Sequence, residues 1–322
     1  MTSTPTKRSL QQKPFRLADK IFFRVASTAA YSAIVIIALV LFFLMQRAWP
    51  AFQEQGVVPF IFESGWDTST EPWILHIGPQ LYGTLLIASL ATVIAVPMAI
   101  SIAYFIVFIA PKPVASAAVI IVDFLAAIPS VVIGLWGLMV FGSTGVEWAE
   151  ILNKWLGFVP IFAHDSGTFA NSPFIASIVL GIMIVPIIAS VTREIFSQMD
   201  REVIKASLAL GGNMESTLRR VILPTSAGGI VGGVLLALGR AMGETVAIYF
   251  VLNLVYDRFN FGMLLMPEGG NVASLILSKF GEASEREIAG LMAAGVVLFV
   301  VTLIVNAVAS YIVDKTQAWR QM

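Results

Sequence analysis

The segment Gly228–Leu254, GGIVGGVLLALGRAMGETVAIYFVLNL, decides the fold class of this chain. A helix of about 20 apolar residues crosses a hydrocarbon core of about 30 Å, and the only charged residues in this segment are Arg240 and Glu244. Four residues apart on one helix, these two side chains would point to the same side. Charge at membrane depth is costly, so ionisable residues there usually face a partner, a water-filled cavity or a transported ion. The pair is therefore the first candidate for a functional site.

The whole composition agrees with a membrane protein. Of 322 residues, 57% are hydrophobic and only 12% are charged, which is too few charges to cover a soluble domain of this length. Six stretches are long and apolar enough to span: 26–46, 81–109, 115–141, 174–192, 227–254 and 288–312. The first is too long for a secretory signal and lacks a cleavage site, so it is predicted to be a retained anchor. We expect an all-α membrane protein with about six transmembrane helices.

The distribution of Lys and Arg predicts the orientation, because positive residues near span ends stay in the cytoplasm. With both termini cytoplasmic, the inner segments carry fourteen positive residues and the three outer loops carry five. The expected parts are a basic tail (1–24), an anchor with an external loop (25–80), a transmembrane domain (81–312) with an inner loop at 193–225, and a C-terminal tail (313–322). The outer loops also hold twelve acidic residues, so an anionic cargo would need to be delivered.

Several kinds of chemistry are excluded. The chain has no cysteine, which rules out disulfides and thiolate metal sites, and His76 and His164 are too far apart in sequence to suggest a metal site. No GxxxxGK[ST] loop occurs, so the chain is not expected to hydrolyse a nucleotide or to hold a cofactor. We expect a transporter subunit rather than an enzyme, with energy supplied by a partner or a gradient.

The inner loop 193–225 is the second informative region. It is rich in charge and contains two short helical patterns around Gly211 and Gly212. Two helices that flank a glycine turn at the membrane surface would form a compact docking site. A solvated loop with incidental helicity is the alternative.

At this point the sequence resembles a known family. Lys205–Gly211, nine further residues and then Val221–Pro224 resemble the EAA-type coupling loop of ABC importer permeases, and Gly239–Thr245, GRAMGET, resembles the GRAxGET segment of phosphate-specific permeases of the PstC type. Similar matches are Gly83–Leu85, Ile128–Val132 and Val305–Asn306. One departure is that Lys205 stands where the motif has Glu, and Ser207 stands where it has Ala. Glu202, three residues earlier, is a candidate for the missing acid.

The resemblance implies a type I ABC permease fold and a function in phosphate import. It implies a second homologous permease, two copies of an ABC ATPase that bind ATP, an extracytoplasmic phosphate-binding protein, and a location in the bacterial plasma membrane, with no nucleic acid as partner. It places Arg240, Glu244 and Thr245 on the substrate path, and Lys205, Ala206, Gly211, Pro224 and Glu202 at the contact with the ATPase.

Physical chemistry gives Arg240 and Glu244 a role that fits this family. Arginine binds phosphate oxygens through two N–H donors at once and stays charged in apolar surroundings. An ionised Glu244 can accept a hydrogen bond from the remaining proton of hydrogen phosphate, whereas fully ionised sulfate has none to give. An unpaired buried acceptor costs about 1–3 kcal/mol. The alternative is a mutual ion pair that only neutralises the helix.

Asp123 is a third ionisable residue in a predicted span and a further candidate for the substrate path. It is expected either to pair across the bundle, with Arg240 or a partner subunit, or to be solvated near the inner interface.

Two other classes of transporter remain open. A sulfate or molybdate permease would share the coupling loop without the GRAxGET segment, and a gradient-driven anion transporter would need no coupling loop.

Overall fold

A computed structural model describes residues 17–69, 71–164, 167–261 and 264–318. The chain divides into two units, residues 1–46 and 47–322. The elements in chain order are α1 (Leu17–Gln55), α2 (Val57–Phe62), β1 (Trp66–Asp67), β2 (Ile74–Leu75), α3 (Gly78–Tyr104), η1 (Phe105–Ile109), α4 (Lys112–Ala127), α5 (Ser130–Trp136), η2 (Gly137–Phe141), α6 (Gly142–Leu156), η3 (Pro160–Phe162), α7 (Pro173–Ser197), α8 (Arg201–Ala209), α9 (Met214–Thr217), η4 (Leu218–Ile222), α10 (Leu223–Met242), α11 (Val246–Val251), α12 (Val272–Phe280) and α13 (Glu285–Ala318).

Six helical stretches are long and apolar enough to cross a membrane, which confirms the predicted number of spans. They are Ile21–Gln55, Gly78–Ile109, Ser130–Leu156, Pro173–Ser197, Met214–Met242 and Glu285–Ile312. The chain is therefore a multi-pass membrane protein. Most of the predicted basic tail, residues 1–16, and the last four residues lie outside the described part of the chain.

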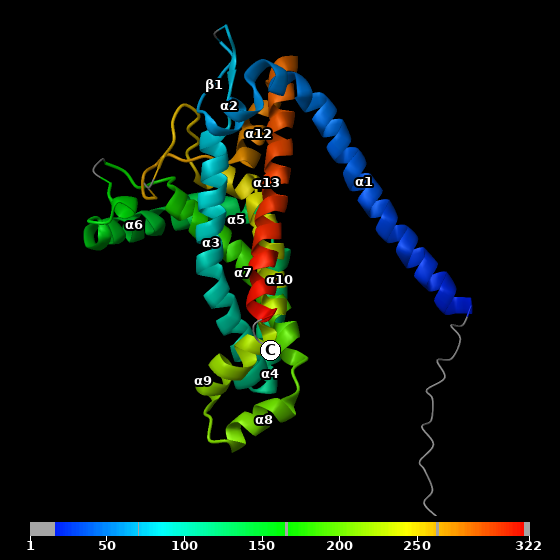
Figure 1. Cartoon of the computed structure of the whole chain (residues 1–322). Helices are drawn as coiled ribbons and strands as arrows, with labels where there is room; N and C mark the ends of the chain where they lie inside the picture. Colours follow the sequence, from blue (N-terminus) through cyan, green and yellow to red (C-terminus); the bar gives the residue numbers. More distant parts are fainter. Residues whose placement is uncertain (1–16, 70, 165–166, 262–263, 319–322) are drawn as a thin grey trace, which may run out of the picture. The chain divides into compact units, whose positions relative to one another are not determined.

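The second unit is built around α7. This helix packs along α3 and α10, and α13 packs against α10 (Figure 1). The middle of α7 is apolar, and its residues Ile184 and Ile188 are fully buried in the core. Glycines on α10 allow close approach, since a methyl group at Gly233 would lie 2.9 Å from Cγ1 of Val191 on α7. Gly233 therefore lets α10 pack closely against α7.

The third predicted span, 115–141, is not one helix. It consists of α4, α5 and η2, and the helix is interrupted at Ile128 and Pro129. Proline has no N–H and disfavours a helical conformation at the residue before it, so the chain ends α4 at Ala127 and begins α5 at Ser130. After η2 the chain turns aside into α6, which lies across the direction of α3 and α7 (Figure 1).

The fifth predicted span, 227–254, is also interrupted. Helix α10 ends at Met242, and the short helix α11 begins at Val246 after a break at residues 243–245. A further short helix, α12, runs from Val272 to Phe280. It begins at an Asn271 side chain that accepts a hydrogen bond from the Ser274 N–H at 2.8 Å.

A small cap covers one end of the bundle. Strands β1 and β2 pair antiparallel, with Trp66 opposite Leu75. The indole of Trp66 is buried and donates to Glu287 Oε1 of α13 at 2.8 Å. Trp66 therefore belongs to the protein interior and not to an aromatic belt at the membrane surface.

Candidate functional site: a free arginine on α10 and the α8–α9 turn

Arg240 lies near the middle of the bundle in depth. Helices α7 and α10 run antiparallel, and Gly233 is level with Val191 because these two residues are in direct contact. Arg240 follows Gly233 by seven residues, or about 10 Å along the helix, which places it level with about residue 184 of α7. Since α7 runs from Pro173 to Ser197 and carries its charged residues, Arg193 and Glu194, near its last turn, Arg240 is level with the apolar middle of α7.

The guanidinium of Arg240 points away from the core of this chain. On α10, Ala237 and Ala241 are fully buried, whereas Gly232, Leu236 and Arg240 are exposed on the opposite face. Within the described residues, Arg240 makes no hydrogen bond or ion pair. A cation at this depth without a partner is available for an anion or for a second subunit.

Glu244 does not share a helix with Arg240, which corrects the geometry that the sequence suggests. Because α10 ends at Met242, the four-residue spacing does not place the two side chains on one face. The side chain of Glu244 is 7% exposed, and its Oε1 accepts a hydrogen bond from the Ala247 N–H in the first turn of α11 at 3.3 Å. The structure shows no Arg240–Glu244 ion pair in this part of the chain.

Thr245 lies between these two helices. Its hydroxyl donates to the Gly243 carbonyl at 3.1 Å, and its own carbonyl accepts from the Ser274 hydroxyl of α12 at 3.0 Å. It therefore ties the break after α10 to α12. The segment 243–245 is held on both sides, so the last turn of α10 has a fixed end.

Asp123 pairs with Arg193 of α7, at 3.8 Å, and accepts a hydrogen bond from the Ser190 hydroxyl at 3.3 Å. Its side chain is 53% exposed, and that of Arg193 is 23% exposed. Of the two expectations for Asp123, the solvated position near an end of the bundle agrees with this exposure, and its cationic partner is Arg193 rather than Arg240.

The α8–α9 segment forms the second part of the site. Two helices flank Gly211 and Gly212, as predicted, and the segment lies at the end of the bundle opposite the β-hairpin (Figure 1). Asp200 caps α8 by accepting from the Glu202 N–H, and Asn213 and Ser216 form a reciprocal capping box on α9. Gly211 adopts φ +87°, a conformation that residues with a Cβ rarely adopt. Leu210, just before it, is 90% exposed.

The two departures from the coupling motif have structural partners. Lys205 Nζ lies 2.9 Å from Glu202 Oε1, so the acid proposed to replace the motif's Glu binds Lys205 on the same surface. The Ser207 hydroxyl lies 2.9 Å from the hydroxyl of Thr217, which is fully buried. Ser207 thus joins α8 to α9, a contact that the sequence spacing did not reveal.

Pro224 lies where the chain enters α10. The π-helix η4 ends at Ile222 and continues without a break into α10, of which Pro224 is the second residue. Proline is tolerated in the first turn of a helix, where its missing N–H has no intrahelical acceptor. Ala206 lies on α8 between Lys205 and Ser207, so all the predicted coupling residues belong to α8, its turn, or the start of α10.

Asn306 of α13 was noticed only as part of a motif. Its amide lies beside Gly239, where a methyl group would be 3.5 Å from Asn306 Nδ2. The Asn306 Oδ1 atom is buried without a hydrogen-bond partner. Because Gly239 directly precedes Arg240, Asn306 is a further polar group at the depth of the arginine.

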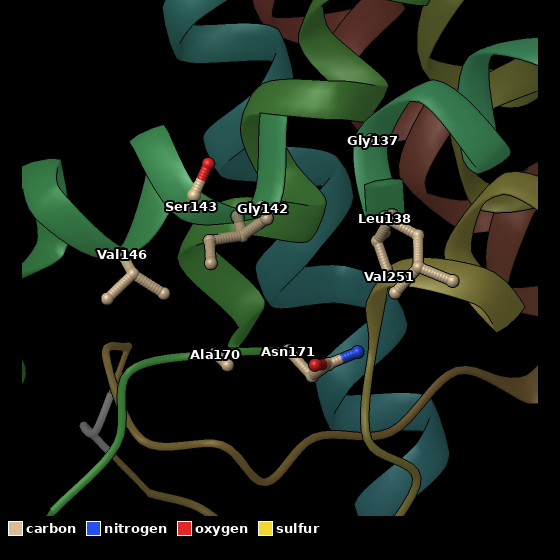
Figure 2. Close-up of a pocket in the computed structure, with 9 residues that line it drawn as sticks. Gly137, Leu138, Gly142, Ser143, Val146, Ala170, Asn171 and Val251 are labelled. Atoms are coloured by element: carbon tan, nitrogen blue, oxygen red, sulfur yellow. The ribbon is translucent and has the colours of Figure 1, made fainter. Parts of the chain in front are cut away.

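Arg240 lines neither the cavity at α6 nor the one beside α8. The cavity in Figure 2 measures about 250 Å³ and lies at the start of α6, between Ser143, Val146 and the segment Ala170–Asn171. A second, of about 320 Å³, lies beside α8 and is lined by Arg201 and Lys205. No group of three metal-ligating residues occurs among the residues described, and His164 Nε2 lies 2.9 Å from the Thr168 carbonyl.

One loop at the opposite end carries a charge pair. Arg258 binds Glu268, with Nε 2.9 Å from Oε2, and this hydrogen bond raises the pKa of Arg258 above its ordinary value. Close by, the rings of Phe259 and Phe261 stack with centroids 4.6 Å apart. These contacts order the loop between α11 and α12.

Comparison with known proteins decides the family. Residues 95–317 match the model of the binding-protein-dependent transport system inner membrane component. The chain belongs to this family. Its fold is that of a type I ABC importer permease.

Among curated relatives, the permease is similar to a phosphate transport system permease protein PstC of Pasteurella multocida, 30% identical over 98% of both chains. It is also similar to phosphate transport system permease protein PstC 2 of Mycobacterium tuberculosis, 34% identical over 95% of this chain and 94% of that one. Among solved structures, a chain of a bacterial alginate ABC transporter matches with a TM-score of 0.59 and 18% identity, over 94% of this permease and 99% of that chain. This last likeness supports the fold alone.

Proposed function

We propose that this permease is the transmembrane subunit of an ATP-driven phosphate importer. The free Arg240 at mid-depth carries the proposal, because an unpaired guanidinium in an apolar bundle suits an anion path. The relatives named as phosphate transport system permeases support the choice of phosphate. The segment GRAMGET contributes both this arginine and the helix break after it.

Arg240 would bind phosphate oxygens through its planar pair of N–H donors. Glu244 would act through Oε2, which has no partner within the described residues, while Oε1 holds the first turn of α11. An ionised Oε2 would accept a hydrogen bond from the hydroxyl of hydrogen phosphate and would disfavour sulfate, which has no O–H to donate. Thr245 would take part by fixing the end of α10. Asp123, at its solvated end position, would stabilise α4 against α7 and lie off the path.

The path itself would run along the exposed face of α10, where Gly232, Leu236 and Arg240 lie. A second, homologous permease would supply the opposite wall. Affinity for phosphate at Arg240 should be modest, since tight binding in mid-path would slow release. High affinity would belong to the extracytoplasmic phosphate-binding protein.

The transporter would contain two copies of an ABC ATPase. One copy would dock on the α8–α9 turn of this chain, and the other would dock on the second permease. This chain would carry no nucleotide site or cofactor of its own, and ATP would bind to the ATPase. The exposed Leu210 and the ion pair Glu202–Lys205 would face that partner, with Gly211 setting the angle between the helices. Co-purification in mild detergent tests the assembly: a bound ATPase supports it, and phosphate uptake by this chain alone would contradict it.

Two substitutions at Gly211 test whether ATP-driven uptake needs the backbone conformation of this turn. Because space around Gly211 is open, a substitution there acts through its positive φ and not through a clash. Gly211→Val should abolish ATP-driven uptake, since a β-branched residue is a strong outlier at positive φ. Gly211→Asn should retain most of it, since asparagine tolerates this region. Equal uptake by the two variants, with equal amounts in the membrane, would show that the conformation of this turn is not needed to couple the ATPase to uptake.

The proposed orientation places both termini and the α8–α9 turn in the cytoplasm of a bacterial cell, across the plasma membrane. The chain lacks cysteine, so single cysteines can be introduced at two exposed positions. Glu282→Cys tests the external side of the membrane, and Glu215→Cys tests the cytoplasmic side. An impermeant thiol reagent should label position 282 in intact cells and position 215 only after permeabilisation. Labelling of 215 in intact cells would reverse the orientation.

A further inference from the structure

Helix α6 has three distinct faces. Gly145 and Ala149 are buried against the rest of the chain. An exposed apolar stripe follows the helix at intervals of three and four residues and continues just past its end; its members are Trp148, Ile151, Trp155 and Phe158. A third face carries Glu147, Glu150 and Lys154. A helix of this kind, with one apolar exposed face beside a charged one, is typical of the membrane surface.

The depth of α6 matches a boundary of the hydrocarbon core. A methyl group at Gly145 would lie 3.0 Å from Ile175 Cγ1, so the start of α6 is level with the first turn of α7. The partly exposed Arg193–Asp123 pair marks the solvated region at the other end of α7. Ile175 and Arg193 are eighteen residues apart in the sequence, which is about 27 Å along a helix and close to the core thickness of about 30 Å.

The direction of α6 fits the same position. It lies across the direction of α3 and α7 rather than along it (Figure 1). The chain already runs along α7 before α6 begins, from Asp123 of α4 beside Ser190 to Gly137 of η2 beside Val179. The second half of the apolar stretch Ser130–Leu156, which is α6, is therefore not needed to reach the level of the first turn of α7. At 15 residues, or about 22 Å, α6 is also shorter than a spanning helix.

We propose that α6 is an interfacial helix that binds the lipid surface through the stripe Trp148, Ile151, Trp155 and Phe158. Tryptophan concentrates at the level of the lipid headgroups because its ring is apolar and its N–H is polar. The charged face, Glu147, Glu150 and Lys154, would then lie in water. The lipid would be recognised as a bilayer boundary, not as a particular headgroup.

Continuity of the apolar surface favours lipid over a protein partner. The exposed residues Leu138, Met139 and Val140 of η2 lead directly into α6. A protein interface would have to cover both η2 and the stripe, whereas a bilayer covers them together. Trp155 is 73% exposed in this chain, and nothing else among the described residues packs over it.

The test uses two matched single-cysteine variants with spin labels. Ile151→Cys lies on the stripe and Glu150→Cys on the charged face, about a quarter turn away, and both positions are exposed on the same helix. Each is measured in the assembled transporter in lipid nanodiscs, by collision with oxygen, which concentrates in lipid, and with a water-soluble nickel chelate. Glu282→Cys, exposed on the loop before α13, gives the reference for water.

The expected result is more collision with oxygen than with nickel at position 151, and the reverse at positions 150 and 282. Strong nickel collision at 151 would place the stripe in water and overturn the proposal. Low collision with both reagents at 151 would show that a protein partner covers the stripe, and would overturn it too. The outcome is independent of the transported ion, so it is distinct from any failure of the phosphate assignment.

Discussion

Arg193 and Arg240 are both on long helices of the same bundle, yet they have different surroundings. Arg193 is near one end of α7 and pairs with Asp123 at 3.8 Å. Arg240 is level with the middle of α7 and has no partner among the described residues. A paired cation near the membrane surface needs no function beyond packing. An unpaired cation at mid-depth is costly unless something outside the chain neutralises it, so the difference separates a structural charge from a functional one.

The same comparison applies to the two acidic residues. Asp123 is half exposed, whereas Glu244 is buried and accepts a backbone hydrogen bond. Each of the following substitutions tests one side of this contrast, beginning with the one that should have the largest effect.

Arg240→Gln should abolish phosphate uptake while the ATPase remains bound to the complex. Removing the guanidinium takes away the only charge on the exposed face of α10 near this depth. Arg240→Lys should recover part of the uptake, because a point charge cannot reproduce two parallel N–H donors. Arg193→Gln is the matched control and should retain most uptake. Radiolabelled phosphate uptake, with excess sulfate as competitor, measures all three, and equal losses at both arginines would remove the distinction between them.

Glu244→Gln should lower uptake less than Arg240→Gln. Glutamine keeps an oxygen that can accept the Ala247 N–H, so α11 stays in place and only the negative charge is lost. The double variant with Arg240→Gln should be as inactive as Arg240→Gln alone. A double-mutant cycle measures this, and recovery of uptake in the double variant would point instead to a mutual ion pair.

Asp123→Asn should leave uptake nearly unchanged and lower stability slightly. A half-exposed ion pair contributes about 0.2–1 kcal/mol, so the melting temperature in detergent should fall by a small amount. Arg193→Gln should produce a similar fall, and the two together should cost less than their sum. Loss of transport by Asp123→Asn in a normally assembled complex would return Asp123 to the path.

Lys205→Glu should have the smallest effect. The pair Lys205–Glu202 is exposed on both sides, and such i,i+3 contacts are worth about 0.2–0.5 kcal/mol. The change also restores the residue that the coupling motif usually has. Uptake should match the parent chain at low and high salt. A severe loss would show that Lys205 itself contacts the ATPase.

Much of the fold was predictable from local sequence. The number of spans follows from apolar length, and the two helices around Gly211 follow from turn chemistry. The interruption after Ala127 could be expected at Pro129, which was predicted as a bend. The break after Met242 could not, because GRAMGETVAIYF contains no proline and its apolar residues continue through the break.

The sequence by itself determined that two charges lie in an apolar run and that their types suit an anion. Only the tertiary structure decided that they are not partners. Arg240 is directed outward because Ala237 and Ala241 occupy the face of α10 against the core. Glu244 is buried because its Oε1 accepts a hydrogen bond from the Ala247 N–H in the first turn of α11. The pairing of Asp123 with Arg193 likewise joins α4 to α7 across 70 residues of sequence. Which charges meet depends on where separate helices pack, and periodicity within one helix carries no information about that.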